Sequence, residues 1–318
     1  CHKVMRTIGT CGSASVSEAV QTVTHGLTLT NPVVIAGPPS YNEAEHCVVR
    51  VFNVTPTTFD LQLHEQPEGG AESDGDGNVH TNENVHWLVL AAGQYELPNG
   101  LLMEVGKVDT TAILQTSGDT WETFSFAPSF STKPAVLNTI QTLNGDATEN
   151  AERMGTRMQN VSFTGFQVAM EDHEGDSAAR TNAETIAWVA IEPGNGTWGG
   201  GPFEAGTTAL LYDDGFSALN FVRTYGEACR FVASQSTWNG MDPGQLRRKG
   251  VGSTSVDMSV IEDTYADAEV YHALESVAYI VIDSDGGNLT ACNQAGNQGD
   301  FTYDPGSTAT WRDQTGTD

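Results

Sequence analysis

Positive charge is scarce in this sequence. Fourteen Lys and Arg residues face 41 Asp and Glu, which gives a formal net charge of −27 over 318 residues. Such a surface repels nucleic acid and anionic membranes, because the attraction to phosphate has the wrong sign. We therefore expect no nucleic-acid partner and a protein that stays soluble at high salt or binds cations. Lys is rarer than Arg, which fits a saline habitat.

Long apolar runs and catalytic motifs are also missing. No stretch of 18 apolar residues is present, so we expect no insertion into a membrane. The chain has no G-x-S-x-G elbow, no P-loop, no G-x-G-x-x-G after a strand and no H-E-x-x-H motif. The sequence therefore favours a protein that is not an enzyme.

Cysteine is sparse, and its spacing argues against a zinc site. None of the five cysteines forms a C-x-x-C pair or has a histidine at zinc-finger distance. The chain begins at Cys1, which predicts either a removed signal peptide or a piece of a longer chain. In a secreted protein the candidate disulfides are Cys1–Cys11 and Cys229–Cys292, with Cys47 free or intermolecular. We expect an extracellular or cell-surface location.

An internal repeat is the clearest positive signal. Three segments align without a gap: RVFNVTPTTFDLQLHE at 50–65, RMQNVSFTGFQVAMED at 157–172 and RRKGVGSTSVDMSVIE at 247–262. Their last halves place apolar residues at every second position, which predicts a strand with one face on a core. Small polar residues before this strand suit a tight turn. Each block is therefore predicted to form a strand, a turn and a second strand.

A second block follows each first one, as ENVHWLVL at 83–90, ETIAWVAI at 184–191 and ESVAYIVI at 275–282. This continuous apolar pattern predicts a strand that starts half-buried and ends fully buried. Trp87, Trp188 and Tyr279 are interpreted as core anchors, with a ligand-stacking platform as the alternative.

The two blocks recur in fixed order, with a matching strand upstream of each pair, which predicts an all-β fold of three tandem antiparallel β-sandwich modules. The predicted divisions are an N-terminal segment 1–26, repeats at 27–115, 116–214 and 215–290, and a C-terminal tail 291–318.

The pattern F-x-V-x-V-x-E, an acidic loop and [HT]-x-x-E-x-V-x-[WY], preceded by P-x-V-V, resembles the H-type lectin domain. The resemblance implies a six-stranded antiparallel sandwich, assembly as a trimer and binding of sugars of the N-acetylgalactosamine type. It further implies tandem use of such units in large extracellular surface proteins. Its motifs are mostly structural, so it argues more for the fold than for sugar binding.

Only a few residues of this chain match the positions that bind sugar in the H-type lectin family. Arg50, His86 and Trp87 are the glycan-binding candidates that the resemblance implies. The His-Trp pair is confined to the first copy, because the others have Ala187–Trp188 and Ala278–Tyr279. Arg50 recurs as an Arg in both other copies, where a structural ion pair is the alternative.

Other candidates lie in loops. Asp74, Asp76 and Asn78 alternate as at the start of a calcium loop, with a plain hydrophilic hairpin loop as the alternative. His272 and Glu275 are expected to point opposite ways on a strand, which argues against joint metal ligation. Four sequons are glycosylation candidates, namely Asn53, Asn160, Asn195 and Asn288.

We expect from these patterns a structural extracellular protein, as a subunit or segment of a surface filament, sheath or fibre that packs with copies of itself. The alternatives are a glycan-binding adhesin and a viral or phage fibre module.

Overall fold

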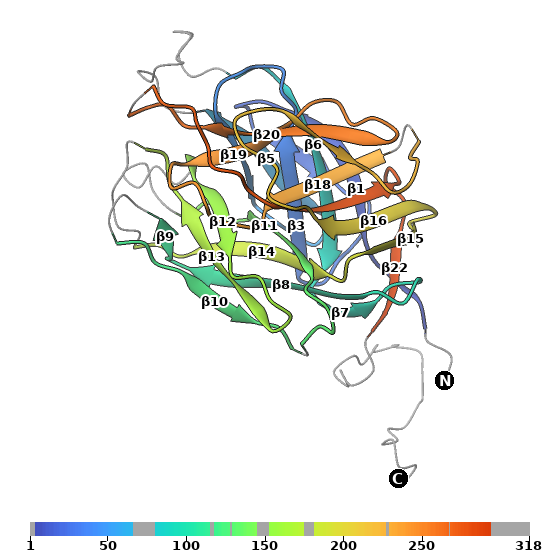
Figure 1. Cartoon of the computed structure of the whole chain (residues 1–318). Helices are drawn as coiled ribbons and strands as arrows, with labels where there is room; N and C mark the ends of the chain where they lie inside the picture. The colour runs from blue at the N-terminus through green and yellow to red at the C-terminus, as the bar shows by residue number, and fades with distance from the viewer. Residues whose placement is uncertain are drawn as a thin grey trace.

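Short apolar runs separated by Gly, Asn and Asp form strands along the whole described chain. The computed structural model describes residues 4–65, 80–114, 118–127, 129–144, 153–174, 181–226, 229–266 and 268–293. Every regular element in these ranges that carries a label is a β-strand, which confirms the predicted all-β class (Figure 1). None of the described segments forms a helix of the length and hydropathy that a membrane crossing requires.

The strands fall into three consecutive sets, which we call the first, second and third units. The first unit contains β1 (Arg6–Val16), β2 (Gln21–Thr24), β3 (Pro32–Pro39), β4 (Cys47–Phe52), β5 (Thr58–Glu65), β6 (Glu83–Ala91) and β7 (Gly93–Glu96). The second contains β8 (Leu102–Thr110), β9 (Ile113–Leu114), β10 (Glu122–Ser125), β11 (Ala135–Ile140), β12 (Gly155–Gln159), β13 (Gly165–Glu171), β14 (Glu184–Ile191) and β15 (Gly194–Trp198). The third contains β16 (Gly201–Thr207), β17 (Ser217–Asn220), β18 (Cys229–Gln235), β19 (Gly244–Arg248), β20 (Ser255–Glu262), β21 (Val277–Asp283) and β22 (Leu289–Asn293).

The same pairing recurs in all three units. Outer sheets have the orders β2-β5-β4, β10-β13-β12 and β17-β20-β19, and inner strands pair as β1-β6-β3, β8-β14-β11 and β16-β21-β18. The register is also shared, since Arg50 faces Gln62, Arg157 faces Ala169 and Arg247 faces Ser259. The strand–turn–strand prediction for the first block is therefore confirmed.

Strand pairing places the divisions between units elsewhere than predicted. Residues 1–26 were expected to lie outside the repeats, but β1 pairs with β6 and β2 pairs with β5. Likewise β8 pairs with β14 and β16 with β21, so each strand that follows a second block belongs to the next copy. Of the predicted tail, Ala291 to Asn293 complete β22, and 294–318 lie outside the described residues.

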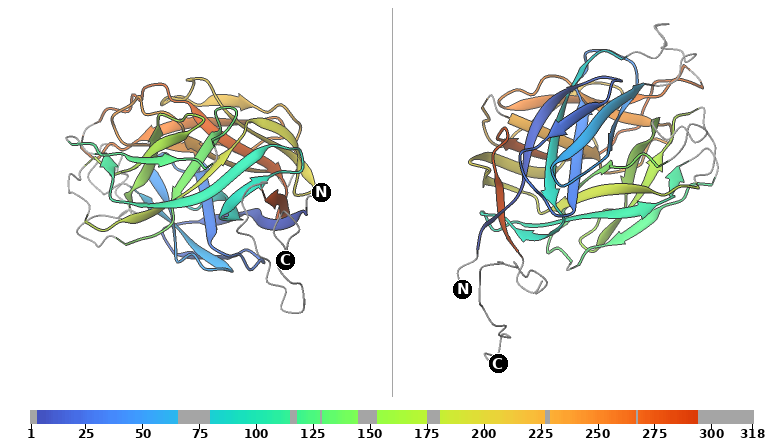
Figure 2. Two further views of the ribbon diagram at one scale, coloured as in Figure 1. Left: turned by 90° about the horizontal axis from the view of Figure 1, so that it is seen from below. Right: turned by 180° about the vertical axis from the view of Figure 1, so that it is seen from behind.

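The chain closes into a ring of units. β7 pairs with β8 and β15 pairs with β16, so each unit ends on a strand that joins the next. β22 completes the series by pairing with β1, with Ala291 opposite Arg6. The blue β1 and the red β22 lie side by side (Figure 2, right). The last strand of the third unit thus holds the first strand of the first unit.

Four hydrophobic cores explain the apolar pattern of the second block. Each unit has its own core between its two sheets, and Trp87, Trp188 and Tyr279 lie in these cores at 6, 1 and 9% exposure. A fourth, central core takes alternate residues from all three units, among them Leu88 and Ile280. β6, β14 and β21 are buried on both faces because they lie between a unit core and the central core. The interpretation of the three aromatic residues as core anchors is confirmed.

Glycine makes room for these rings. A Cβ on Gly12 would lie 2.4 Å from the Trp87 ring, and one on Gly106 would lie 2.4 Å from the Trp188 ring. The two glycines occupy the same place in β1 and β8, which supports assigning β1 to the first unit.

Candidate functional site: the junctions between units

The three residues predicted to bind a sugar are buried, so the prediction of a surface site there is wrong. Arg50, His86 and Trp87 are 0, 6 and 6% exposed. Trp87 packs edge-on against Phe59 in the core of the first unit, with 5.4 Å between ring centroids. His86 Nδ1 accepts a hydrogen bond of 2.9 Å from the backbone N–H of Phe231 in the third unit. The polar side chains of the first unit are thus used to hold its neighbours.

Arg50 and its two counterparts form a cycle of ion pairs. Arg50 lies 3.8 Å from Glu184 of the second unit, and Arg157 lies 2.5 Å from Glu275 of the third. Arg247 of the third unit pairs with Glu83 of the first, which closes the cycle. All six side chains are at most 1% exposed. The structural interpretation of the repeated Arg is therefore confirmed.

Each glutamate of the cycle is also held by a loop of its own unit. Ser40, Thr142 and Thr237 donate their hydroxyls to Glu83, Glu184 and Glu275. Backbone N–H groups two residues further on, at Asn42, Asn144 and Asn239, donate to the same carboxylates at 2.8–2.9 Å. Sequence reasoning missed these hydroxyls, although the signal is present as SYN, TLN and TWN.

Two carboxylates share Arg157 but differ in pKa. Burial opposes the ionisation of Glu275, but His272, Arg157 and Thr237 outweigh it and hold its pKa at about 2. Glu171 also contacts Arg157, at 2.9 Å, yet burial dominates and raises its pKa to about 7. Glu275 is therefore ionised at neutral pH.

His272 and Glu275 face each other, contrary to the expectation from strand alternation. His272 Nε2 lies 3.5 Å from Glu275 Oε1, and its Nδ1 lies 2.6 Å from Glu262 Oε1. Alternation does not apply because His272 precedes β21 and lies outside any strand. His80 stands in the same relation to Glu83, at 3.8 Å.

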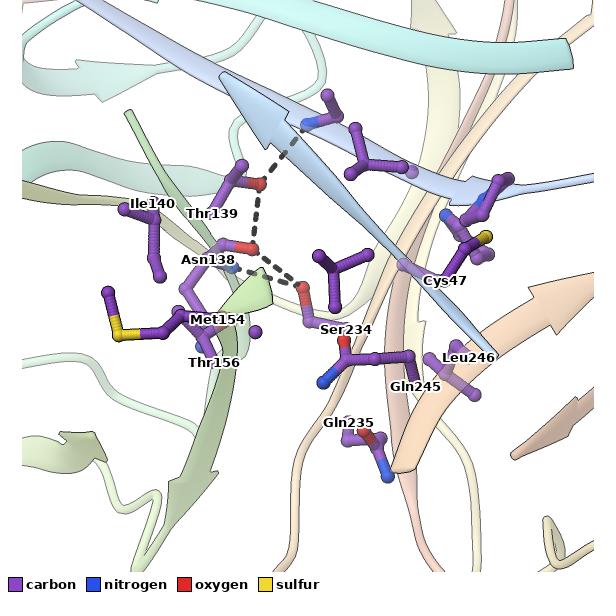
Figure 3. Close-up of a pocket in the computed structure, with 18 residues that line it drawn as sticks. Cys47, Asn138, Thr139, Ile140, Met154, Thr156, Ser234, Gln235, Gln245 and Leu246 are labelled. Atoms are coloured by element: carbon purple, nitrogen blue, oxygen red, sulfur yellow. Dashed lines mark hydrogen bonds between the residues drawn. The ribbon is translucent and has the colours of Figure 1, made fainter. Parts of the chain in front are cut away.

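The inner strands meet around a small cavity. The N–H of Ala36 donates to Thr139 Oγ1 at 3.2 Å, and the N–H of Asn138 donates to Ser234 Oγ at 3.1 Å. Figure 3 shows Asn138, Thr139 and Ser234 converging there from two units. The cavity has about 60 Å³ and is lined by equivalent segments of all three units. It is far smaller than ordinary small-molecule sites.

Two larger grooves open where units meet. One of about 550 Å³ lies between the first and second units and includes Asn53, Asn144 and Thr185. The other, of about 690 Å³, lies between the third and first units and includes Asn42 and Asn84. Asn42 and Asn144 are equivalent positions, so the two grooves are counterparts.

The predicted disulfide between Cys229 and Cys292 is wrong. Cys11, Cys47, Cys229 and Cys292 are all buried and carry free thiols. Burial raises the pKa of Cys11 and of Cys229 to about 12, which leaves both unreactive at neutral pH. The free state expected as one option for Cys47 is confirmed. Cys1 lies outside the described residues.

The predicted calcium loop also lies outside the described residues, with Asp74, Asp76 and Asn78. All four sequon asparagines are exposed, which leaves glycosylation a prediction. Asn53 and Asn160 adopt positive φ angles of 49° and 53° in equivalent turns. Asn accepts this left-handed conformation more readily than most residues, which explains its recurrence.

Acid should weaken the junction of the first and third units through His86. Burial, helped by Arg248 and Arg230, lowers the pKa of His86 to about 2. Because this pKa is lower in the folded state, only the unfolded chain takes up the proton below pH 6.5, and stability is lost as pH falls. Between pH 7.5 and 5.5 this one residue should cost about 1.4 kcal/mol.

Urea unfolding of the wild type and of His86→Gln at both pH values measures how much His86 contributes to the loss of stability in acid. The variant keeps a hydrogen-bond acceptor but does not titrate, so its pH dependence should be smaller by that amount. An identical pH dependence in the two proteins would contradict the assignment.

Fold and junctions together define an all-β protein of three repeated strand sets that are closed into a ring. No protein-family model matches the chain, and no solved structure matches it. The chain is similar to Halomucin from Haloquadratum walsbyi, with 27% identity over 259 residues. The alignment covers 79% of this chain and 3% of Halomucin, so the chain spans a very small part of that relative.

Proposed function

We propose that this chain is a structural segment of an extracellular surface protein, built from three H-type lectin-like units. The observation that carries the proposal is the pairing of β1 with β22. It brings the two ends of the fold to one place, so that such rings can follow one another along a long chain. The similarity to a small part of Halomucin supports both an extracellular setting and a place within a much longer protein.

The charge distribution fits an extracellular setting at high salt. Arg50, Arg157, Arg247 and Arg248, four of the fourteen positive side chains, are at most 2% exposed and cannot offset surface acids locally. Self-repulsion over such a surface weakens the compact state at low ionic strength. Salt shortens the range of this repulsion from about 10 Å at 0.1 M to about 3 Å at 1 M. We infer a protein suited to molar salt.

In this proposal the partners are copies of the same ring, in a filament, sheath or fibre. The test is immunogold labelling of native material from producing cells, with antibodies against the recombinant chain. Label on extracellular filaments, sheaths or fibres is the expected result, whereas label confined to the cell interior would overturn the proposal.

Sedimentation of the recombinant chain in molar salt tests self-association separately. Concentration-dependent association is expected. A monomer at all concentrations would remove self-assembly from the proposal while leaving the extracellular role standing.

The two grooves between units favour glycan binding as a second candidate function. They are wide, polar and repeated, and the larger one is lined by Asn42 and by Asn84, whose Oδ1 accepts a hydrogen bond of 2.8 Å from the buried Arg248. A glycan array with wild type and Asn42→Ala tests this function. Binding to a glycan that becomes weaker in Asn42→Ala would support this function. No binding of the wild type to any glycan would exclude it.

A further inference from the structure

Three carboxylates meet at one edge of the third unit. Asp242 lies in the loop before β19, Glu262 ends β20, and Glu269 lies in the loop between β20 and β21. One oxygen of each carboxylate lies within 4.8 Å of the others. No other group of this kind occurs in the described part of the chain. Asp242 and Glu269 are exposed, so solvent reaches the cluster from one side.

Glu262 provides the observation that distinguishes this cluster from an ordinary acidic surface. Its side chain is 2% exposed, and its Oε2 is buried with no hydrogen-bond partner. A buried carboxylate oxygen without a donor is costly, and native structures leave few of them. A cation bound between the three carboxylates would satisfy it.

The other oxygen of Glu262 is already fixed. His272 donates from Nδ1 to Glu262 Oε1 at 2.6 Å, while its Nε2 faces Glu275 Oε1 at 3.5 Å. A ligating carboxylate is commonly oriented by such an outer partner. Oε2 is therefore the oxygen of Glu262 that has no hydrogen-bond partner.

The electrostatic surroundings of Glu262 also favour a bound cation. Burial raises the pKa of Glu262; His272 opposes the rise, and the charges of Glu269 and Asp242 add to it. Neither Asp242 nor Glu262 has a Lys or Arg partner among the ion pairs of the described residues. Arg157, a buried positive side chain of the second unit, is engaged by Glu171 and Glu275.

We propose that Asp242, Glu262 and Glu269 bind a calcium ion. All three offer oxygen, the donor that hard divalent cations prefer, and Ca²⁺ tolerates the irregular geometry of ligands drawn from separate loops. Water and backbone carbonyls complete a coordination of six to eight oxygens.

The ion would act on the junction of the second and third units. The loop that carries Glu269 begins beside Asp263, whose Oδ2 accepts a hydrogen bond from the N–H of Glu174 in the second unit. Ala266 of the same loop donates its N–H to Glu174 Oε2 at 2.8 Å. Tying Glu269 to β20 therefore fixes a segment that bridges the two units.

Calorimetric titration of the chelator-treated full chain with CaCl2, in 2 M KCl, tests the proposal. The high salt suppresses diffuse binding to the acidic surface. Asp242→Asn and Glu262→Gln are the test variants, and Asp285→Asn is the control because it removes an exposed carboxylate outside the cluster. We expect the wild type and Asp285→Asn to bind alike.

Each test variant should lose one equivalent of calcium or bind it at least tenfold more weakly. Asp242 is exposed, so its variant keeps the test valid even if Glu262→Gln folds poorly. Wild-type stoichiometry and affinity in Asp242→Asn, or no binding by the wild type, would overturn the proposal.

Discussion

Arg157→Met should destabilise the folded chain by about 3–5 kcal/mol, the range found when one partner of a buried ion pair is removed. The Arg157 side chain is 0% exposed and lies between Glu171 at 2.9 Å and Glu275 at 2.5 Å. Methionine fills much of the volume but supplies no charge or donor. Glu275, ionised by its surroundings, would then remain buried between two units without its Arg counterion. Guanidinium-induced unfolding in molar salt measures the loss.

Asp285→Asn is the control for this prediction. It breaks the pair between Arg230 and Asp285, whose 2.7 Å distance is as short as that of a buried pair. Asp285 is 57% exposed, so solvent screens the pair and the cost should stay below about 1 kcal/mol. Equal losses in the two variants would show that the cycle of buried ion pairs does not hold the units together.

Leu289→Asp should have a comparable effect, about 4 kcal/mol, because it places a carboxylate in the central core. Leu289 is 0% exposed and belongs to that core, which all three units share. The charge would push β22 away from β1 and β7, and both strands would lose a hydrogen-bonded neighbour. Hydrogen exchange of the β1 amides should rise together with the loss of global stability.

Thr290→Asp is the matched control, one residue further along the same strand. Thr290 is half-buried on the opposite face, so the added carboxylate keeps contact with water. Its cost should be a small fraction of that of Leu289→Asp. If both variants unfold at the same denaturant concentration, the closing strand does not seal the ring as described.

The part of the fold that the sequence predicts is the part governed by local patterns. Alternation places Phe59, Phe166 and Val256 on buried faces, and a gapless repeat carries the same strand register into all three units. The unbroken apolar run of the second block indicates a strand buried on both faces. These features depend on side-chain period, which the sequence displays directly.

Features that depend on pairing between strands far apart in the sequence are not visible in local patterns. β1 and β22 stand at opposite ends of the chain, and no local signal marks them as partners. The segments at 99–106 and 199–206 correspond in sequence, but only the pairing of β8 and β16 shows that each joins the copy after it. The divisions between units were misplaced for this reason.

The candidate site illustrates the same limit. From sequence alone, a His or Arg on a strand is equally consistent with a contact to a ligand and with a contact to another buried group of the protein. The actual partner of His86 is a backbone N–H 145 residues away along the chain. The repeated glutamates were visible in the sequence, but which Arg meets which Glu depends on the cyclic order of the units.

The closure of the ring by β22 also determines how the molecule responds to tension. In the antiparallel pair, Arg6 opens β1 directly opposite Ala291 near the end of β22, so a pull on both ends loads one hydrogen bond at a time. A strand pair loaded in this way separates one hydrogen bond after another. A strand pair that is pulled along its length must instead break all its hydrogen bonds together. Once it opens, the 288 residues from Arg6 to Asn293 hold a hidden length of roughly 1,000 Å of extended chain. In the surface protein that we propose, a string of such rings would lengthen under flow and absorb the load before any covalent bond is strained.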